Sequence, residues 1–404
     1  MKKVITISWV VDAYSTGRII KTIEDYADED YKFIHCVEAL LPGQQSRENV
    51  YLISGIMNLR FSIRWAKLTG NPYGCGNMAT RRLCRFIASQ KPDIVHIHCP
   101  NSRSVNLYKL LNFLEKLRCK IVITNHAEFF ITGNCAHADE CEGYMTGCYN
   151  CPDYHKSTGA WFINRTHRNW QLMKDCMSDA SIRMVAVSPW SQKRIEESTI
   201  GKGKKVSVIK NGIDTSVFTY QHITDGLSFL NRSEVREYYI HVTSNFSDDI
   251  NDIKGGSYII ELARKLPELM FVVVGPNYCV GSMPDNIILL GSINDMELLA
   301  KCYSAARALI MVSKKETFGL TCAEALCCGT PVIGFKNGGS ESIAMEKYSS
   351  FVEFGHIEEL KDKLLAFEYS KVDKQRLSEE AAAEYSNESM AGQYIELYQE
   401  VLNE

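Results

Sequence analysis

The chain has 404 residues, of which 45% are hydrophobic and 23% are charged, and this balance excludes a disordered, collagen-like or coiled-coil protein. Its length allows roughly two to three domains, and its 45 basic and 48 acidic residues give a formal net charge of −3. The longest apolar stretches, such as residues 4–11, are far shorter than the ~18 residues that a membrane-spanning helix needs. Fifteen cysteines, an odd number that includes the adjacent Cys327 and Cys328, favour a reducing compartment, so we expect a cytoplasmic protein.

Short apolar runs bounded by turn residues alternate with longer segments of helical spacing along nearly the whole chain. Several runs are almost continuous in Val and Ile, as strands buried on both faces of a parallel sheet require. The predicted strands are residues 4–10, 33–37, 94–98, 121–124, 184–187 and 206–209, and then 239–242, 271–274, 287–290, 308–312 and 332–335. This pattern predicts an α/β chain with one doubly wound parallel sheet in each half.

The turn sequence KNGID at residues 210–214, followed by a polar irregular stretch, indicates a domain boundary. We expect an N-terminal Rossmann-like domain, a C-terminal Rossmann-like domain and a final amphipathic helix that crosses back to the first domain. Their predicted ranges are residues 1–210, 211–385 and 386–404, with a cysteine-containing loop at 132–155. Because open parallel sheets bind ligands outside the carboxyl ends of their strands, two such sheets would hold their sites facing across a cleft.

Charge is unevenly distributed, because residues 49–92 contain no acid and seven bases. Such a stretch points to a polyanionic neighbour, namely a membrane surface, a phosphorylated acceptor or nucleic acid. No nucleic-acid-binding motif accompanies the charge, so nucleic acid is not an expected partner. A helical pattern places Ile56, Leu59, Ile63 and Ala66 on one face and Arg60, Arg64 and Lys67 on another. This pattern suits peripheral contact with an anionic membrane, and it equally suits a helix packed on its own sheet with a solvated charged rim.

The sharpest functional signal follows the predicted strand that ends at Val312. The chain turns through residues 316–320 and enters a helix that contains Glu324. Backbone N–H groups and the positive dipole end at the start of this helix form an anion site, and Gly319 lets a ligand approach the main chain. Glu316 and Glu324 are placed to grip ligand hydroxyls. Alternatively, Glu316 is a first-turn acid favoured by the dipole and Glu324 is a solvated helix residue.

Four cysteines with spacing C-x5-C-x6-C-x2-C form a second cluster, Cys135, Cys141, Cys148 and Cys151. Four thiolates with one C-x2-C knuckle can close a tetrahedral structural zinc site, which leaves no open position for a substrate. Free thiols or a redox pair fit the spacing equally well, since the two knuckles of a zinc ribbon are not present. The sequence therefore predicts a possible structural zinc site in this loop.

Several motifs along the chain resemble those of one family. Glu316 and Glu324, eight positions apart around Phe318-Gly319 and followed by CGTPV and a Gly-Gly pair, resemble the E-x7-E signature of the retaining group one glycosyltransferases with the GT-B fold. This large group includes bacterial capsule and exopolysaccharide enzymes. Residues 211–214 are similar to the family's hinge motif, and Lys254-Gly255 to its diphosphate-binding step. The resemblance extends over essentially the whole chain.

The resemblance implies two Rossmann-like domains facing across a cleft and a sugar transferred, with retention, from a nucleoside-diphosphate donor to a hydroxyl of a glycan or lipid-linked acceptor. Glu324 would hold the ribose hydroxyls and Glu316 the hydroxyls of the donor sugar near the reacting carbon. Lys254 would neutralise the diphosphate, so that no cofactor is required for catalysis. Main-chain amides for the donor would come from Phe318, Gly319 and Leu320. Many related enzymes build glycans on lipid-diphosphate carriers, so we expect attachment at the inner face of the cytoplasmic membrane.

Other matches to the family are partial. Family members often carry an arginine some residues before the lysine that corresponds to Lys254, just after the strand, where residues 243–246 of this chain read TSNF and contain no arginine. We include Asn245, from this place, among the donor-binding residues. Gly17 and Arg18 resemble the family's glycine loop facing the donor, although a solvated arginine at a helix start also fits.

The segment from His126 is similar to the pattern His-Asp-x-Trp-x-Phe-Thr-Gly-x-Cys, with Ala127 in place of the usual aspartate. We predict that His126 donates hydrogen bonds beside the reacting carbon, whereas core packing suffices for His96 and His98. Ala127 and the absent arginine motivate one alternative, a sugar-nucleotide-binding protein without transfer activity. A nucleic-acid-binding module is the other.

Overall fold

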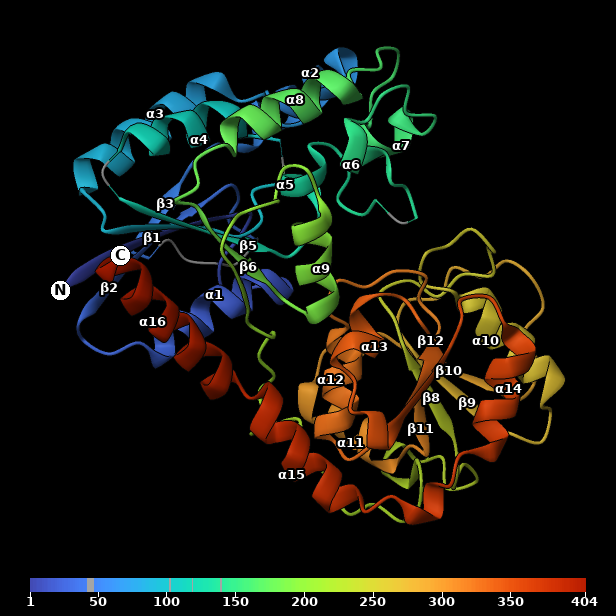
Figure 1. Ribbon diagram of the computed structural model, residues 1–404. Helices are drawn as coiled ribbons and strands as arrows, with labels where there is room; N and C mark the ends of the chain where they lie inside the picture. Colours follow the sequence, from blue (N-terminus) through green and yellow to red (C-terminus); the bar gives the residue numbers. More distant parts are fainter. Residues whose placement is uncertain (42–46, 102, 118, 139) are drawn as a thin grey trace. The chain divides into compact units, whose positions relative to one another are not determined.

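The computed structural model describes residues 1–41, 47–101, 103–117, 119–138 and 140–404. The chain divides into two units, and Figure 1 shows a sheet with flanking helices in each. Unit 1 comprises Met1–Ile209 together with Met390–Glu404, and unit 2 comprises Lys210–Ser389. The sequence prediction places its boundaries after residues 210 and 385, which differ from these divisions by one and four residues.

Unit 1 contains seven parallel strands in the described residues, in the order β3-β2-β1-β4-β5-β6-β7. The strands are β1 (Lys2–Ser8), β2 (Tyr31–Val37), β3 (Val50–Leu52), β4 (Ile94–Ile97), β5 (Lys120–Asn125), β6 (Arg183–Ala186) and β7 (Val206–Val208). The helices are α1 (Tyr14–Tyr26), α2 (Ile56–Thr69), α3 (Asn77–Gln90), α4 (Leu107–Lys116), α5 (Phe129–Thr132), α6 (Gly143–Thr146), α7 (Tyr154–Thr158), α8 (Thr166–Cys176) and α9 (Pro189–Glu197).

Unit 2 contains six parallel strands in its described residues, in the order β10-β9-β8-β11-β12-β13. The strands are β8 (Tyr239–Val242), β9 (Phe271–Val274), β10 (Ile287–Gly291), β11 (Ala308–Met311), β12 (Val332–Phe335) and β13 (Ser349–Val352). The helices are α10 (Gly256–Lys265), α11 (Met296–Ala305), α12 (Leu320–Cys327), α13 (Gly339–Ile343), α14 (Ile357–Ala366) and α15 (Lys374–Tyr385), with short 3₁₀ turns at Ser228–Leu230, Glu346–Tyr348 and Tyr369–Lys371. The last helix, α16 (Asn387–Asn403), begins in unit 2 and continues into unit 1.

Two strands lie outside the sequence prediction, β3 and β13. Each is at an edge of its sheet, where only one neighbour pairs with it. β3 has three residues, and β13 begins with two serines and is half-buried over most of its length. Edge strands do not need the continuous apolar sequence that identifies a strand buried on both faces, which explains why the pattern did not reveal them.

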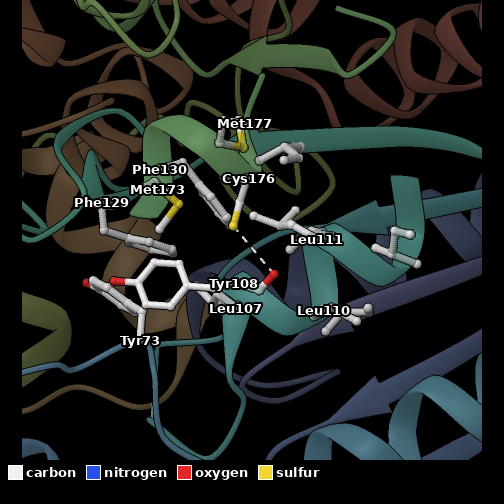
Figure 2. Close-up of a cluster of buried hydrophobic side chains, with 14 of the residues drawn as sticks. Tyr73, Leu107, Tyr108, Leu110, Leu111, Phe129, Phe130, Met173, Cys176 and Met177 are labelled. Atoms are coloured by element: carbon white, nitrogen blue, oxygen red, sulfur yellow. Dashed lines mark hydrogen bonds between the residues drawn. The ribbon is translucent and has the colours of Figure 1, made fainter. Parts of the chain in front are cut away.

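The core of unit 1 lies on both faces of its sheet. Buried residues of α3, α4, α5 and α8 pack on one face, and residues of α1 and α16 pack on the other (Figure 1). Figure 2 shows Leu111 and Tyr108 of α4 near Phe130 of α5 and Cys176 of α8, whose Sγ donates to the Tyr108 carbonyl at 3.5 Å. Because truncating a buried Leu or Phe costs about 2–5 kcal/mol, this packing fixes α5 and the preceding turn.

Helix α16 is tied to the sheet of unit 1 by tyrosines as well as by apolar packing. Tyr398 and Tyr394 are buried, and their hydroxyls lie 2.6 Å from His96 Nδ1 and 3.1 Å from Thr124 Oγ1. A buried tyrosine hydroxyl needs such a partner, and β4 and β5 provide it. The end of the chain is therefore part of the helical layer on one face of the unit 1 sheet.

No helix in the described residues has the length and apolar character needed to cross a membrane.

Candidate functional site

In unit 2, a turn joins the carboxyl end of β11 to the start of α12. Gly319 is the N-cap of α12 with φ of 92° and provides no side-chain cap to the first-turn amides. Its missing Cβ matters because an added Cβ would lie 2.4 Å from Ser340 Oγ. Phe318 is buried, and Leu320 begins the helix with its side chain half-buried. The turn therefore presents main-chain amides at the positive end of the α12 dipole, which is an arrangement that binds anions.

Glu316 and Lys254 meet at this turn. Lys254 Nζ donates to Glu316 Oε1 at 2.8 Å, and both side chains remain about one quarter exposed. The main chain of Glu316 is fixed by two hydrogen bonds, from its N–H to the Asn337 carbonyl at 3.1 Å and from the Gly339 N–H to its carbonyl at 2.8 Å. The carboxylate and the ammonium group are thus both accessible and held next to one another.

The loop before α10 presses Lys254 against the end of β11. Lys254 N donates to Asp252 Oδ1 at 2.8 Å, and Lys314 N donates to the Ile253 carbonyl at 2.7 Å. Gly255 has φ of 73°, and a Cβ there would lie 2.2 Å from the Val312 carbonyl oxygen. A side chain at position 255 would therefore push this loop away from β11. The glycine after Lys254 is needed to bring the lysine to Glu316.

Glu324 is half-buried on α12 and is not a freely solvated helix residue. The hydroxyl of buried Tyr303, from α11, donates to Glu324 Oε2 at 3.0 Å. Burial, and then the neighbouring carboxylate, raise the pKa of Tyr303 well above its usual value, so the phenol keeps its proton. Tyr303 therefore fixes one oxygen of Glu324. Tyr303 could not be predicted from the sequence, because a helical pattern does not show which tyrosine faces a carboxylate on the next helix.

Asn245 lies in the same loop as Lys254, which connects β8 to α10. Its side-chain amide donates to Asp252 Oδ2, and its main-chain N–H donates to Thr243 Oγ1 at 3.2 Å. Because Asp252 also accepts the Lys254 N–H, Asn245 helps to order the loop that carries the lysine. The structure therefore brings Asn245, Lys254 and Glu316 to one edge of the unit 2 sheet.

Gly17 and Arg18 lie within α1 of unit 1, not in a loop. Gly17 is buried, and a Cβ there would lie 3.2 Å from Asp12 N, whose N–H donates to the Gly17 carbonyl at 2.9 Å. The glycine thus allows the turn after β1 to fold back over the first turn of α1. Arg18 is exposed on the same helix. The expected glycine loop is corrected to a helical glycine with a close backbone contact.

His126 follows the last residue of β5 and is partly exposed. Its Nε2 lies 3.1 Å from Nδ1 of His98, which is almost fully buried just after β4. His98 thus does more than fill the core, whereas His96 is fully buried and bonded to Tyr398 and Thr124. The contact was missed because a strand pattern does not show which histidines on adjacent strands meet.

Burial keeps these histidines neutral. It lowers the pKa of His126 to about 4 and that of His96 to about 3, and together with the neighbouring imidazoles it holds the pKa of His98 well below its usual value. Near neutral pH, one imidazole of the His98–His126 pair therefore donates a hydrogen bond to the other. His126 is positioned as a neutral hydrogen-bonding group at the carboxyl edge of the unit 1 sheet.

The cysteine-containing loop is ordered by a buried carboxylate. Glu128 Oε2 accepts from Ala138 N at 2.7 Å, and Glu128 Oε1 accepts from Arg194 Nε at 2.6 Å. Cys148 is buried, Cys141 is exposed, and Cys135 and Cys151 are half-buried. Burial, together with the neighbouring thiols, raises the pKa of Cys135 and of Cys148 to about 12.

Within the described ranges, no three His, Cys, Asp or Glu side chains are grouped so that they could hold a metal ion. Zinc at Cys135, Cys141, Cys148 and Cys151 therefore stays a prediction from spacing.

Two family models match the chain. Residues 245–384 match the model described as Glycosyl transferases group 1, and residues 54–217 match the model described as Glycosyltransferase Family 4. A curated relative, the putative colanic acid biosynthesis glycosyl transferase WcaC of Escherichia coli strain K12, is 24% identical over 323 residues, which cover 76% of each chain. The N-acetyl-alpha-D-glucosaminyl L-malate synthase of Bacillus anthracis is 25% identical over 50% of this chain and 55% of its own length.

Solved structures of similar fold cover the whole chain. Sucrose-phosphate synthase from Thermosynechococcus elongatus superposes with a TM-score of 0.69 at 15% identity and covers 100% of both chains. Anabaena Alr3699/HepE in complex with UDP-glucose gives a TM-score of 0.65 at 13% identity, over 99% of this chain and 100% of the other. The chain is therefore an α/β protein of the GT-B fold, with two Rossmann-like domains that each match a glycosyltransferase family model.

Proposed function

We propose that the chain is a retaining glycosyltransferase that moves a hexose-type sugar from a nucleoside diphosphate to a hydroxyl group of a glycan or lipid-linked acceptor. One observation carries the proposal, namely the accessible ion pair of Lys254 and Glu316 beside the uncapped start of α12. A ligand with negative phosphates and sugar hydroxyls matches this pair, since the ammonium group binds phosphate and the carboxylate accepts from hydroxyls. Solved neighbours of the same fold are described in complex with UDP and with UDP-glucose.

The ion pair also suggests how the donor binds. A diphosphate that approaches the α12 amides would draw Lys254 away from Glu316, because a phosphate carries more negative charge than a carboxylate. Glu316 would then be released to accept hydrogen bonds from the donor sugar, and Glu324, fixed by Tyr303, would accept from the ribose. Donor binding would therefore separate the ion pair and use both of its members.

In the reaction, the bond between the anomeric carbon and the diphosphate oxygen breaks, and a bond to the acceptor oxygen forms on the same face. The acceptor proton passes to the departing phosphate oxygen. Lys254 and the amides of the α12 start balance the charge on the leaving group, so the proposed catalysis needs no metal. In unit 1, neutral His126 would donate a hydrogen bond to the sugar and place its reacting carbon.

We further propose a role in cell-surface polysaccharide synthesis on the cytoplasmic side. Two similar proteins support it: WcaC is described as a putative colanic acid biosynthesis enzyme, and WaaG as a glycosyltransferase involved in lipopolysaccharide biosynthesis, with a TM-score of 0.64 at 12% identity. The acceptor would accordingly be a growing saccharide, free or lipid-linked.

The experiment is a transfer and hydrolysis assay with a panel of nucleoside-diphosphate sugars. Glu316→Gln is expected to lower turnover at least about 100-fold, because it removes a charged group beside the reacting carbon. Lys265→Ala, which breaks the exposed Lys265–Glu358 ion pair elsewhere in unit 2, serves as the matched control and is expected to retain activity. A chain that binds a nucleotide sugar but neither transfers nor hydrolyses it would instead be the non-catalytic binding protein.

A further inference from the structure

Large apolar side chains are exposed along one side of α2 in unit 1. They are Met57, Phe61, Trp65 and Leu68, with exposed fractions of 79%, 67%, 51% and 43%. Spacings of four and three residues place them in one row on the helix, which we call the α2 stripe. The rings of Phe61 and Trp65 stack with centroids 6.1 Å apart. Ser62 and Ala66 of the same helix are buried, so the α2 stripe faces away from the core.

A cavity extends the α2 stripe toward α3. It has a volume of about 320 Å³ and is lined by Phe61, Trp65 and Met78, the last of which is 75% exposed at the start of α3. Buried serines, Ser62 and Ser104 among them, also line it. Exposed aromatic side chains and buried hydroxyl groups thus line the same cavity. Such a lining suits an amphiphilic molecule, which has an apolar and a polar part.

A second segment extends the α2 stripe at the other end of the helix. Trp161, Phe162 and Ile163 are 47%, 75% and 41% exposed. Trp161 N donates to the Lys67 carbonyl at 2.8 Å, and Lys67 Nζ lies 5.9 Å from the centre of the Trp161 ring. Exposed apolar side chains therefore lie at the start of α3, along α2 and on this segment, which contacts α2 at Lys67, and most of them are aromatic or thioether in character.

The charges on α2 and α3 have one sign. Exposed arginines stand on α2 and α3, and residues 49–92 contain no acidic residue; the arginines are Arg60, Arg64, Arg81, Arg82 and Arg85. A second copy of the same face would meet like charges, whereas an anionic surface would meet opposite ones. Aromatic side chains beside arginines are the composition of segments that lie in the headgroup region of a bilayer.

We propose that the α2 stripe docks unit 1 on an anionic lipid bilayer, with the aromatic side chains in the interface and the arginines on the headgroups. The α2 stripe lies on the opposite side of the helix from the apolar face predicted from the sequence, which comprises Ile56, Leu59, Ile63 and Ala66. Of those, Ala66 is buried and Leu59 and Ile63 are half-buried, while the side chain of Ile56 lies outside the described part. The proposal rests on the proposed function only in that a lipid-linked acceptor would be found at such a surface.

Vesicle sedimentation tests the proposal with the full chain. The wild type is expected to bind vesicles of phosphatidylglycerol and phosphatidylcholine, to bind pure phosphatidylcholine far more weakly, and to be released by high salt. Phe61→Ser combined with Trp65→Ser is expected to lower the partition coefficient at least about ten-fold, because two large apolar groups no longer enter the interface. Tyr26→Ser with Leu365→Ser is the matched control, since these side chains are 53% and 54% exposed outside this face. The control is expected to bind as the wild type does.

Three results would overturn the proposal. The first is a stripe variant that binds anionic vesicles as tightly as the wild type, and the second is a wild type that does not bind them at low salt. The third result is a wild type that forms a concentration-dependent dimer and binds no vesicles, together with a stripe variant that no longer dimerises. Hydrolysis of the nucleotide sugar, measured without vesicles, separates this test from that of the proposed function. The stripe variant is expected to hydrolyse the donor as the wild type does. Loss of vesicle binding with intact hydrolysis supports docking, whereas a wild type that binds vesicles but never uses a nucleotide sugar refutes the proposed function alone.

Discussion

His98 Nδ1 lies 3.1 Å from His126 Nε2, so a buried residue at the end of β4 holds the ring of a partly exposed residue at the end of β5. The exposed histidine is the one that the sequence pattern singled out, and its buried partner gives it a fixed orientation. We regard His98 as a positioning residue, because it would act on the proposed donor sugar only through His126.

Replacing His98 with Ala is expected to lower kcat about 10- to 100-fold while leaving the donor KM nearly unchanged, because His126 loses the group that orients it. Stability should fall by about 1–3 kcal/mol, as when a buried hydrogen bond is broken. His98→Asn, which keeps a donor and an acceptor, should recover part of kcat. His35→Asn is the control: His35 is buried in the same unit and bonded to Thr6, 2.8 Å away, so its loss should cost stability without the loss in kcat.

The buried histidines should make the protein sensitive to acid. His96 has a pKa of about 3 and His126 of about 4 in the folded chain, whereas both titrate near 6.5 when unfolded. The unfolded state thus binds more protons below pH 6.5, and the stability present above that value is lost as the pH falls toward 4 and 3. Each histidine that is neutral in the folded chain and protonated in the unfolded chain contributes a slope of up to about 1.4 kcal/mol per pH unit. Urea unfolding at a series of pH values measures the slope, which His96→Gln should reduce; an unchanged slope would contradict the assignment.

Tyr303→Phe should weaken binding of the nucleoside diphosphate about 3- to 10-fold, because Glu324 loses the hydroxyl that fixes it, worth about 1 kcal/mol. Titration calorimetry measures the effect. Tyr238→Phe removes a buried hydroxyl that donates to the Cys302 carbonyl at 2.7 Å in the same unit. It should cost similar stability and leave the affinity unchanged, so equal effects of the two substitutions on affinity would exclude a role of Tyr303 in the site.

Gly319→Ala should lower donor affinity and destabilise unit 2 by about 1–3 kcal/mol, since the residue has φ of 92° and the new Cβ would meet Ser340 Oγ. Adding Ser340→Gly removes the contact but not the backbone strain, and should restore only part of the stability. Gly392→Ala is the opposite case. Gly392 lies within α16 with nothing within 4 Å of its Cβ position, and alanine there should stabilise the chain by about 1 kcal/mol in thermal unfolding.

Much of the fold could be predicted because its central strands are apolar runs, as in β9 (FVVV) and β11 (ALIM). The edge strands β3 and β13 were not predicted, because β3 has only three residues and β13 begins with two serines, whereas the edge strands β7 and β10 were predicted from their apolar residues. Lys254 and Glu316 were each predicted to contact the donor, from separate motifs. The structure adds that the two side chains form an ion pair. Tyr303 and His98 were not predicted as site residues, because their roles depend on contacts across neighbouring helices or strands. Gly17 was expected in a loop, but it lies within α1. Glycine is favoured both in turns and where the backbone makes a close contact, so the residue type alone does not distinguish the two.

In the proposed function, Lys254, Glu316 and the start of α12 hold a nucleoside diphosphate. The most direct measurement compares, by calorimetry, the affinity of the wild type and Lys254→Ala for a nucleoside diphosphate and for the corresponding nucleoside without phosphate. The substitution is expected to weaken the affinity for the diphosphate at least about ten-fold, because a charged hydrogen bond is worth about 1.5–3 kcal/mol, and to leave the affinity for the nucleoside unchanged. Equal affinity of both proteins for the diphosphate, or an equal loss for both ligands, would contradict it.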